Sequence, residues 1–303
     1  MPDPEPTRQK IIPSLWFDHT AQEAAGFYTS VFPDGRILAT SHYPTENLPD
    51  FQREFAGAVL TVDFELAGFR FTALNAGREF SATPANSFFV NFDPSRDPAA
   101  REHLDELWAA LLDGGQVLMP LDAYPFSPRY GWVQDRFGLG WQVFLADPDG
   151  SPRPTIVPSL LFGNVAQNRA REALEYYTRI LPDSRLGTLV PYEDTTGPAT
   201  PGALMYGDAE LAGVWFAAMD AGVEMPTTFT PGVSYQIFCA DQAEIDRYWD
   251  VLSSEPEAEA CGWCQDRFGV SWQVVPAAMD ELMARPGAWT TLLGMKKLVI
   301  SDF

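Results

Sequence analysis

An internal repeat dominates this sequence of 303 residues. Four blocks of the first half return in the same order in the second half: IIPSLWF (11–17) as IVPSLLF (156–162), FYTSVFPDGRI (27–37) as YYTRILPDSRL (176–186), ELAGFRFTALNAG (65–77) as ELAGVWFAAMDAG (210–222), and GWVQDRFGLGWQVF (131–144) as GWCQDRFGVSWQVV (262–275). Such self-similarity indicates one structural unit built twice. We therefore expect two modules, residues 1–150 and 151–303, joined through the Pro- and Gly-containing stretch 147–155.

Each repeat shows the same succession of strand and helix patterns. A short apolar strand precedes a helix whose apolar residues recur every three or four positions; a hairpin, a third strand, a second helix and a final hairpin follow. The final hairpin turns at 135–138 and again at 266–269, where Asp first and Gly last are typical of a type I turn. Capping-box patterns mark the first helix, at Thr20 and Glu23, and the last, at Asp241 and Glu244. The sequence thus predicts an α+β fold of tandem βαβββ modules.

The charge and the apolar pattern exclude several classes of function. The formal net charge of −21 repels phosphate backbones, so we expect no nucleic-acid partner. No apolar run is long enough for a transmembrane helix, and the first residues, MPDPEPTRQK, lack the apolar segment of a secretory signal. We therefore expect a cytoplasmic protein without a membrane partner.

The three cysteines predict no disulfide framework, because an odd and sparse count is typical of a reducing compartment. Cys261 and Cys264 form a CxxC, but this pair lies in a predicted strand. A redox CxxC needs a helix N-terminus to lower the pKa of a thiol, so we interpret these cysteines, with Cys239, as structural.

The local strings of both repeats resemble the PhnB-like branch of the vicinal-oxygen-chelate superfamily, the glyoxalase/bleomycin-resistance/dioxygenase group. The resemblance rests on PSLWFD followed by FYTSVFPDGRI, on MPLDAYPFSPRYGW, on the repeated QDRFG and WQV, and on the terminal MKKLVISDF. It implies curved mixed sheets that form open cavities. Some PhnB-like proteins are labelled 3-demethylubiquinone-9 3-methyltransferases.

In metal-using members of that superfamily, the first and last strands of a module supply the ligands of a divalent ion. By the resemblance, the first-strand positions fall on Ile11 and Ile156, which cannot bind a metal. The last-strand positions fall on Gln142 and Gln273, which are neutral and weak ligands. The three histidines show no metal-ligand spacing. We therefore expect no metal and no cofactor.

The candidate ligand-binding residues are polar groups expected to face the cavities, and aromatic residues near them. Strand alternation separates Gln142 from Trp141 and places Gln142 on the cavity side. Sheet-side hydrogen bonding is an equally good account of the glutamines. The candidate residues are Gln142, Gln273, Asn75, Asp220, Asn91, Gln236, Tyr124 and Phe126.

The first repeat carries ten residues more than the second between its second helix and its last turn, in the stretch that contains Tyr124 and Phe126. Two interpretations remain: a proline-stiffened flap over the first cavity, or packing against the other module.

Three functions are compatible with these residues. The favoured one is binding of a small organic molecule without the usual metal site. The first alternative is a divalent-metal-dependent lyase, isomerase or dioxygenase. The second alternative, a methyltransferase, is disfavoured because no Gly-rich strand-to-helix loop is present and GDAELAG (207–213) lies in a predicted hairpin. A homodimer is compatible with the sequence, and the modules could pair within one chain or across such a dimer.

Overall fold

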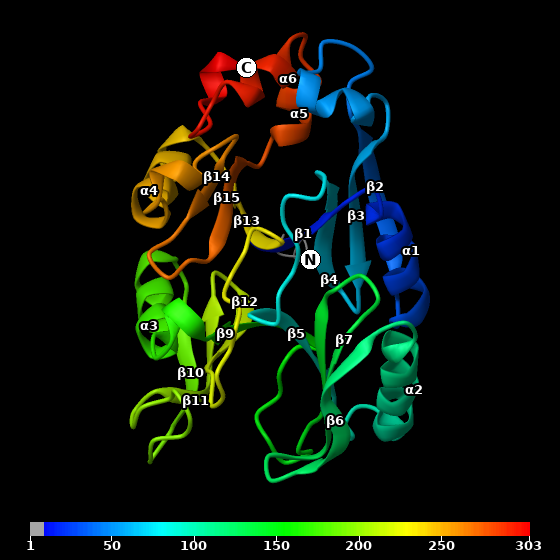
Figure 1. Cartoon of the computed structure of the whole chain (residues 1–303), viewed down its shortest axis with the longest axis vertical. Helices are drawn as coiled ribbons and strands as arrows, with labels where there is room; N and C mark the ends of the chain where they lie inside the picture. The colour runs from blue at the N-terminus through cyan, green and yellow to red at the C-terminus, as the bar shows by residue number, and fades with distance from the viewer. Residues whose placement is uncertain (1–8) are drawn as a thin grey trace, which may run out of the picture.

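The computed structural model describes residues 9–303, in which the order βαβββ occurs twice in each half, the last time with one strand fewer (Figure 1). The first half contains β1 (Ile11–Phe17), α1 (Ala21–Val31), β2 (Arg36–His42), η1 (Asp50–Phe55), β3 (Val59–Leu66), β4 (Phe69–Asn75), β5 (Asn86–Phe92), α2 (Ala100–Leu112), β6 (Gln116–Tyr124), β7 (Ser127–Gln134) and β8 (Gly140–Leu145). The second half contains β9 (Ile156–Phe162), η2 (Asn164–Ala166), α3 (Ala170–Ile180), β10 (Arg185–Pro191), β11 (Leu204–Leu211), β12 (Val214–Asp220), β13 (Val233–Cys239), α4 (Gln242–Leu252), η3 (Pro256–Ala258), β14 (Trp263–Gln265), β15 (Ser271–Pro276), α5 (Met279–Met283), α6 (Ala288–Leu293) and η4 (Ile300–Asp302).

The strands form two mixed, curved sheets, and each sheet takes strands from both halves. The seven-stranded sheet has the order β14-β15-β13-β1-β4-β3-β2, and the eight-stranded sheet has the order β10-β11-β12-β9-β5-β8-β7-β6. The antiparallel ladders β1–β13 and β5–β9 join the halves, with Ile11 opposite Ile237 and Val90 opposite Ile156. The halves therefore complete each other's sheets within one chain, and the predicted fold class is confirmed.

The helices cover one face of each sheet, and the core lies beneath them. Figure 1 shows α1 and α2 along one outer side of the molecule and α3 and α4 along the other. In the first half the ring centroids of Tyr28 and Trp141 lie 5.4 Å apart. In the second half those of Tyr177 and Trp272 lie 5.6 Å apart. Each half thus has its own group of packed rings, and both groups belong to one continuous hydrophobic core.

A buried aspartate ties each core to a turn. Asp266 Oδ2 accepts hydrogen bonds from Tyr177 Oη at 2.6 Å and Trp272 Nε1 at 2.8 Å. Its Oδ1 accepts from the backbone nitrogens of Phe268 and Val270 at 2.8 and 3.1 Å. Burial raises the pKa of Asp266, although these hydrogen bonds oppose the shift. Asp266 is therefore a turn residue, as predicted, through its Oδ1. Its Oδ2 accepts the hydrogen bonds of the two core side chains.

The first half repeats this arrangement at Asp135. Its Oδ2 accepts from Tyr28 Oη and from Trp141 Nε1, both at 2.8 Å. The repeated string QDRFG therefore places a buried aspartate between a tyrosine and a tryptophan in both halves.

Several local predictions can be compared with the structure. The capping box at α4 is confirmed, because Asp241 Oδ1 accepts from the backbone nitrogen of Glu244 at 2.9 Å and Glu244 Oε2 accepts from that of Ala240 at 2.7 Å. The capping box at α1 is wrong, because the side chain of Thr20 makes no capping hydrogen bond there. The edge strands β2 and β10 were not predicted, because their mostly exposed residues carry little apolar alternation. Within residues 9–303, no helix is long and apolar enough to cross a membrane.

The two halves differ most after their second helices. The ten extra residues of the first repeat belong to the hairpin of β6 and β7, which extends the eight-stranded sheet. In the second repeat β14 has only three residues, and the chain beyond β15 packs beside it instead. There the backbone nitrogens of Cys261 and Gly262 donate to the carbonyl oxygens of Met295 and Lys296 at 2.8 and 2.7 Å. The extra residues therefore extend the sheet as paired strands, and the flap over a cavity stays a prediction.

Candidate functional site

Each sheet has one face that the helices do not cover, which we call its inner face. Alternation along the strands decides which side chains lie there. In β8, Trp141 and Val143 belong to the core beneath the helices, whereas Gln142 lies on the inner face. In β15, likewise, Trp272 belongs to the core beneath the helices and Gln273 lies on the inner face.

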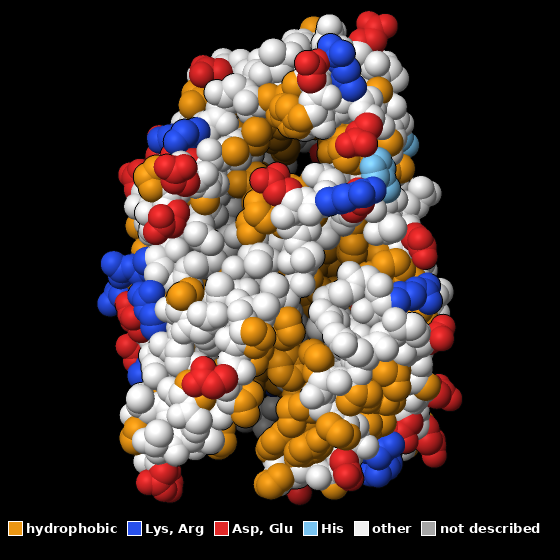
Figure 2. Space-filling model, in the orientation of Figure 1, with side chains coloured by type: hydrophobic (Ala, Val, Ile, Leu, Met, Phe, Trp, Pro, Cys, Tyr) orange, Lys and Arg blue, Asp and Glu red, His pale blue; other side chains and the backbone are white. Residues whose placement is uncertain are grey.

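Aromatic and methionine side chains line the inner face of the eight-stranded sheet. The residues of this aromatic face are Phe89, Tyr130, Val157 and Ala217, which are buried, and Met119, Tyr124, Trp132, Phe144, Tyr206, Trp215 and Met219, which are partly buried around them. Figure 2 shows hydrophobic side chains gathered around a depression in the lower half of the molecule, where Figure 1 draws the strands of this sheet. A margin of half-buried rings around a packed floor offers contact area for an apolar molecule.

Gln142 lies in the floor of the aromatic face and is 1% exposed. Its Oε1 accepts from Tyr130 Oη at 2.6 Å, and its Nε2 donates to Ser87 Oγ at 2.8 Å. Burial raises the pKa of Tyr130, so this hydroxyl remains a neutral donor. The amide is fully hydrogen-bonded within the sheet, and it stabilises the floor beneath the aromatic side chains.

The inner face of the seven-stranded sheet is more polar. The residues of this polar face are Ser14, Asp63, Thr72, Ser234, Gln236 and Gln273. Gln273 Nε2 donates to Ser234 Oγ at 2.9 Å, and Gln273 Oε1 accepts from Gln236 Nε2 at 3.3 Å. Thr72 Oγ1 donates to Asp63 Oδ1 at 2.6 Å. Neighbouring side chains therefore hold both glutamines of this face in place.

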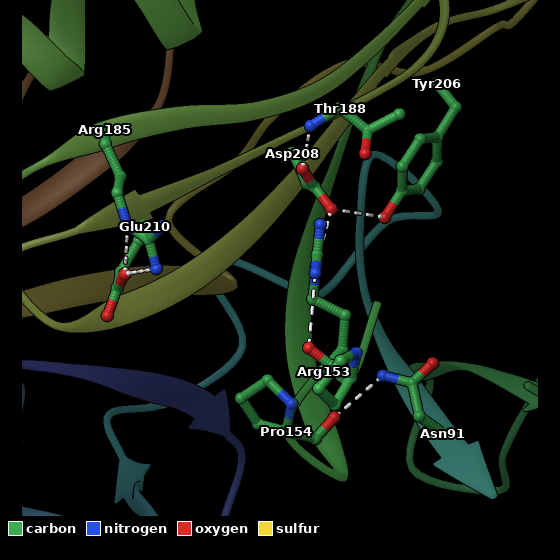
Figure 3. A network of polar contacts seen from close by, with 9 residues as sticks. Asn91, Arg153, Pro154, Arg185, Thr188, Tyr206, Asp208 and Glu210 are labelled. Carbon is green, nitrogen blue, oxygen red and sulfur yellow. Dashed lines mark hydrogen bonds and ion pairs between the residues drawn. The ribbon is translucent and has the colours of Figure 1, made fainter. Parts of the chain in front are cut away.

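An arginine of the linker reaches one end of the aromatic face (Figure 3). Arg153 Nε donates to Asp208 Oδ2 at 2.8 Å, and its guanidinium carbon lies 4.0 Å from the ring centroid of Trp215. Asp208 also accepts from Tyr206 Oη at 3.1 Å and from the backbone nitrogen of Thr188 at 2.6 Å. The carboxylate is 2% exposed and therefore depends on these three donors.

Arg153 and Asp208 were not among the residues predicted for the site. A signal was available, because an arginine stands three residues before the first strand of each repeat, at Arg8 and Arg153. An aspartate likewise stands at the same place in the first hairpin strand of both repeats, at Asp63 on β3 and Asp208 on β11. Arg8 lies outside the described residues.

Asn75 and Asp220 lie on the helix-covered side, which corrects the expectation that they face a cavity. Asn75 Oδ1 accepts from the backbone nitrogen of Ala21 at 2.9 Å, at the start of α1. Asp220 Oδ1 accepts from that of Ala170 at 3.1 Å, at the start of α3. The physical reason is that the first N–H groups of a helix need an acceptor, and these side chains supply it from the end of a neighbouring strand.

The other three predicted residues lie at the edge of the aromatic face. Asn91 Nδ2 donates to the carbonyl oxygen of Pro154 at 2.8 Å and so holds the linker (Figure 3). Tyr124 belongs to the margin, and its ring stacks on that of Phe126 at 5.5 Å. Phe126, at the tip of the β6–β7 hairpin, is 57% exposed and stacks in turn on Phe144 at 6.4 Å.

The donor set does not fit the divalent ion that the superfamily resemblance implies. Ile11 and Ile156 lie in the core beneath the helices. The first-strand residues that share cross-strand rows with the two glutamines are Ile12 and Val157, whose side chains carry no donor atom. Among residues 9–303, no three His, Cys, Asp or Glu side chains are grouped so that they could hold a metal.

Two surface pockets are lined by residues other than those named for the aromatic and polar faces. One, of about 340 Å³, is lined by Thr45, Glu46, Asn47, Leu48, Arg53 and Ala56. The other, of about 490 Å³, is lined by Ser81, Ala82, Gly114, Gly115, Gln116, Gln134, Asp135, Arg136 and Gly138.

The cysteines should react slowly with thiol reagents in the folded protein. Cys264 lies in β14 and Cys239 in β13, both are buried, and burial raises the pKa of each thiol, for Cys239 to about 12. Burial raises the pKa of the partly exposed Cys261 as well. We expect Ellman's reagent at pH 8 to label Cys261 slowly and the other two only after unfolding in guanidinium. Rapid labelling of Cys264 would contradict the structural interpretation of the CxxC.

Comparison with known proteins gives one family match over most of the chain. The family model described as 3-demethylubiquinone-9 3-methyltransferase matches residues 9–144 and again residues 154–275. None of the curated proteins matches the chain significantly.

Solved structures similar to the chain include single-repeat and double-length proteins. A PhnB protein from Bacillus cereus is 34% identical, over 46% of this chain and 100% of its own, with a TM-score of 0.39. A protein from Pseudomonas aeruginosa is 22% identical, over 45% of this chain and 97% of its own, with a TM-score of 0.38. A glyoxalase I variant from Zea mays is 11% identical, over 91% of this chain and 96% of its own, with a TM-score of 0.47.

Proposed function

Because this chain belongs to the 3-demethylubiquinone-9 3-methyltransferase family, a PhnB-like branch of the vicinal-oxygen-chelate superfamily, we propose that it binds a small organic molecule on the aromatic face. The observation that carries this proposal is the margin of half-buried rings around a floor held by Gln142. Rings such as Phe144 and Trp132 offer flat apolar area. A molecule that is planar and largely apolar would match them.

The neighbouring polar groups would orient such a molecule. Arg153 has its Nε bonded to Asp208 and its Nη1 3.2 Å from the carbonyl oxygen of Pro152, while its Nη2 donates to no described residue. A few aimed polar groups among apolar ones are typical of small-molecule sites. Binding requires no metal in this proposal, since the inner-face side chains themselves supply the contacts.

The methyltransferase activity named in the family description is not what we propose. In residues 9–303, GDAELAG (207–213) runs along β11 into the turn before β12 and does not precede a helix. The first strands of the halves enter their helices through FDHTA and FGNVAQNRA, which lack a Gly-rich loop for a nucleotide-like cofactor. Cytoplasmic location and a homodimer stay predictions.

Titration with Nile red, an uncharged planar dye whose emission rises in apolar surroundings, tests the proposal. The variant Phe144→Ser should bind the dye about tenfold more weakly, because loss of one aromatic contact removes roughly 1–2 kcal/mol. The matched control is Phe51→Ser, since Phe51 is 71% exposed on η1, away from the aromatic face. Equal dye affinity of wild type and Phe144→Ser would contradict the proposal.

A further inference from the structure

We infer that the molecule bound on the aromatic face is a planar aromatic compound with a neutral carbonyl oxygen, and that Arg153 is the residue that selects for this oxygen. The inference rests on the proposed function and deepens it, because it names the polar group of the ligand and the donor that bonds it.

Two arginines beside β11 use their donors differently (Figure 3). Glu210 Oε2 lies 2.8 Å from Nε and 2.6 Å from Nη2 of Arg185, so one carboxylate oxygen occupies that edge of the guanidinium. Arg153 bonds Asp208 Oδ2 through Nε alone at 2.8 Å, while Asp208 Oδ1 accepts from the backbone nitrogen of Thr188 at 2.6 Å. In the described part of the chain, Nη2 of Arg153 therefore has no acceptor.

The guanidinium of Arg153 is fixed by three contacts. Its Nε is bonded to Asp208, its Nη1 donates to the carbonyl oxygen of Pro152 at 3.2 Å, and its central carbon lies 4.0 Å from the ring centroid of Trp215. The first repeat has Arg70 at the position of Trp215, so it lacks this supporting indole. The side chain of Arg153 is 21% exposed. A donor that is fixed but still exposed loses little conformational freedom when it bonds a ligand.

The linker places Arg153 beside the apolar margin of the aromatic face. Asn91 Nδ2 donates to the carbonyl oxygen of Pro154 at 2.8 Å, and Asn91 lies opposite Phe144 in the ladder of β5 and β8. A ring stacked on Phe144 would therefore lie next to the linker. An acceptor at the edge of that ring would come within reach of Arg153.

The charges around Arg153 favour a neutral acceptor over an anion. Its charge is already balanced by Asp208, whose carboxylate is 2% exposed. A ligand carboxylate on Nη2 would stand close to this buried charge of the same sign and would lose its hydration beside apolar rings. A carbonyl oxygen accepts the same hydrogen bond at a much smaller cost of desolvation. The net charge of −21 acts in the same direction.

The experiment uses three naphthalenes of nearly the same shape. 2-Acetylnaphthalene has the carbonyl oxygen, 2-isopropenylnaphthalene has a methylene group in its place, and 2-naphthoate is an anion at pH 7.5. Equilibrium dialysis gives the affinity of each compound for wild type and for the double variant Arg153→Met with Asp208→Asn, which removes the donor together with the charge that it balances. Arg185→Met is the matched control beside the same indole, and circular dichroism melting confirms that each variant is folded.

We expect the double variant to bind 2-acetylnaphthalene about tenfold more weakly than wild type does, because a charge-assisted hydrogen bond is lost. Its affinities for the other two compounds should stay within about threefold of wild type, and Arg185→Met should change none of the three. Comparing variants for one compound removes the difference in hydrophobicity between the compounds.

An unchanged affinity of the double variant for the ketone would overturn the inference and leave the proposed function standing. A larger loss for naphthoate than for the ketone would also overturn it, because the site would then be one for anions. If none of the three compounds bound to wild type, the proposed function itself would be contradicted.

Should the double variant not fold, the infrared carbonyl stretch of 2-acetylnaphthalene bound to wild type decides. A bond from a guanidinium is stronger than one from water, so the stretch should lie below its wavenumber in water. A stretch at or above that value rejects the inference.

Discussion

Replacing Arg153 with alanine should lower the free energy of unfolding by about 3–5 kcal/mol, the usual effect of leaving a buried charge without its ionic partner. Asp208 is 2% exposed and is bonded to Arg153 Nε at 2.8 Å. After the substitution, the hydroxyl of Tyr206 and the backbone nitrogen of Thr188 would be its remaining donors. Urea unfolding followed by tryptophan fluorescence measures the change.

Arg185 provides the matched control for this prediction. It too pairs with a carboxylate of β11, Glu210 at 2.6 Å, and its guanidinium carbon lies 5.4 Å from the same Trp215 ring. Its side chain is 69% exposed, so Arg185→Ala should cost less than about 1 kcal/mol. If Arg153→Ala and Arg185→Ala lowered the free energy of unfolding by similar amounts, the ion pair of Arg153 would contribute no more than an exposed one, and the prediction would be wrong. Combining Arg153→Ala with Asp208→Asn should recover part of the stability, because the uncompensated charge is gone.

The second large effect is expected for Asp266→Ala, which should destabilise the protein by roughly 4–6 kcal/mol or prevent folding. The substitution removes the acceptor of four hydrogen bonds: those donated by Tyr177, Trp272 and the backbone nitrogens of Phe268 and Val270. All four donors would be left in a site that water does not reach. Chemical unfolding again supplies the measurement.

Asp241→Ala is the control for an aspartate with a purely local role. Its side chain caps α4 at the surface through one bond to the backbone nitrogen of Glu244, so its loss should cost about 1 kcal/mol. Tyr177→Phe removes a single donor to Asp266 and should cost an intermediate amount. A cost for Asp266→Ala no greater than that of Asp241→Ala would refute the account of the buried network.

The repeat and the strand alternation were sufficient to predict the fold class and the faces of several residues. Gln142 and Gln273 lie on the inner faces and their tryptophan neighbours lie in the core, because adjacent strand residues point to opposite sides. Their partners could not be predicted from one sequence, since Ser87 and Ser234 come from strands that are distant in the chain.

Other features could not be predicted, for physical reasons that differ from residue to residue. Asn75 and Asp220 end their strands, where the pattern no longer indicates a face, and the helix starts that they cap lie about fifty positions earlier in the chain. Arg153 lies in a Pro- and Gly-containing stretch whose composition indicates a linker, and only the fold shows what its side chain contacts. The exchange of strands between the halves is also invisible in sequence, because pairing within or between halves would bury the same residues.

The joining of both halves in one chain has a consequence for how the two inner faces can change over time. In a symmetric pair of identical half-length chains, any substitution would occur at both equivalent positions at once, so both inner faces would gain or lose a property together. Here the ladders β1–β13 and β5–β9 keep the pseudo-symmetric arrangement, while positions 70 and 215 are encoded separately. Fusion thus allows the inner faces of the two sheets to differ, as the aromatic face and the polar face do.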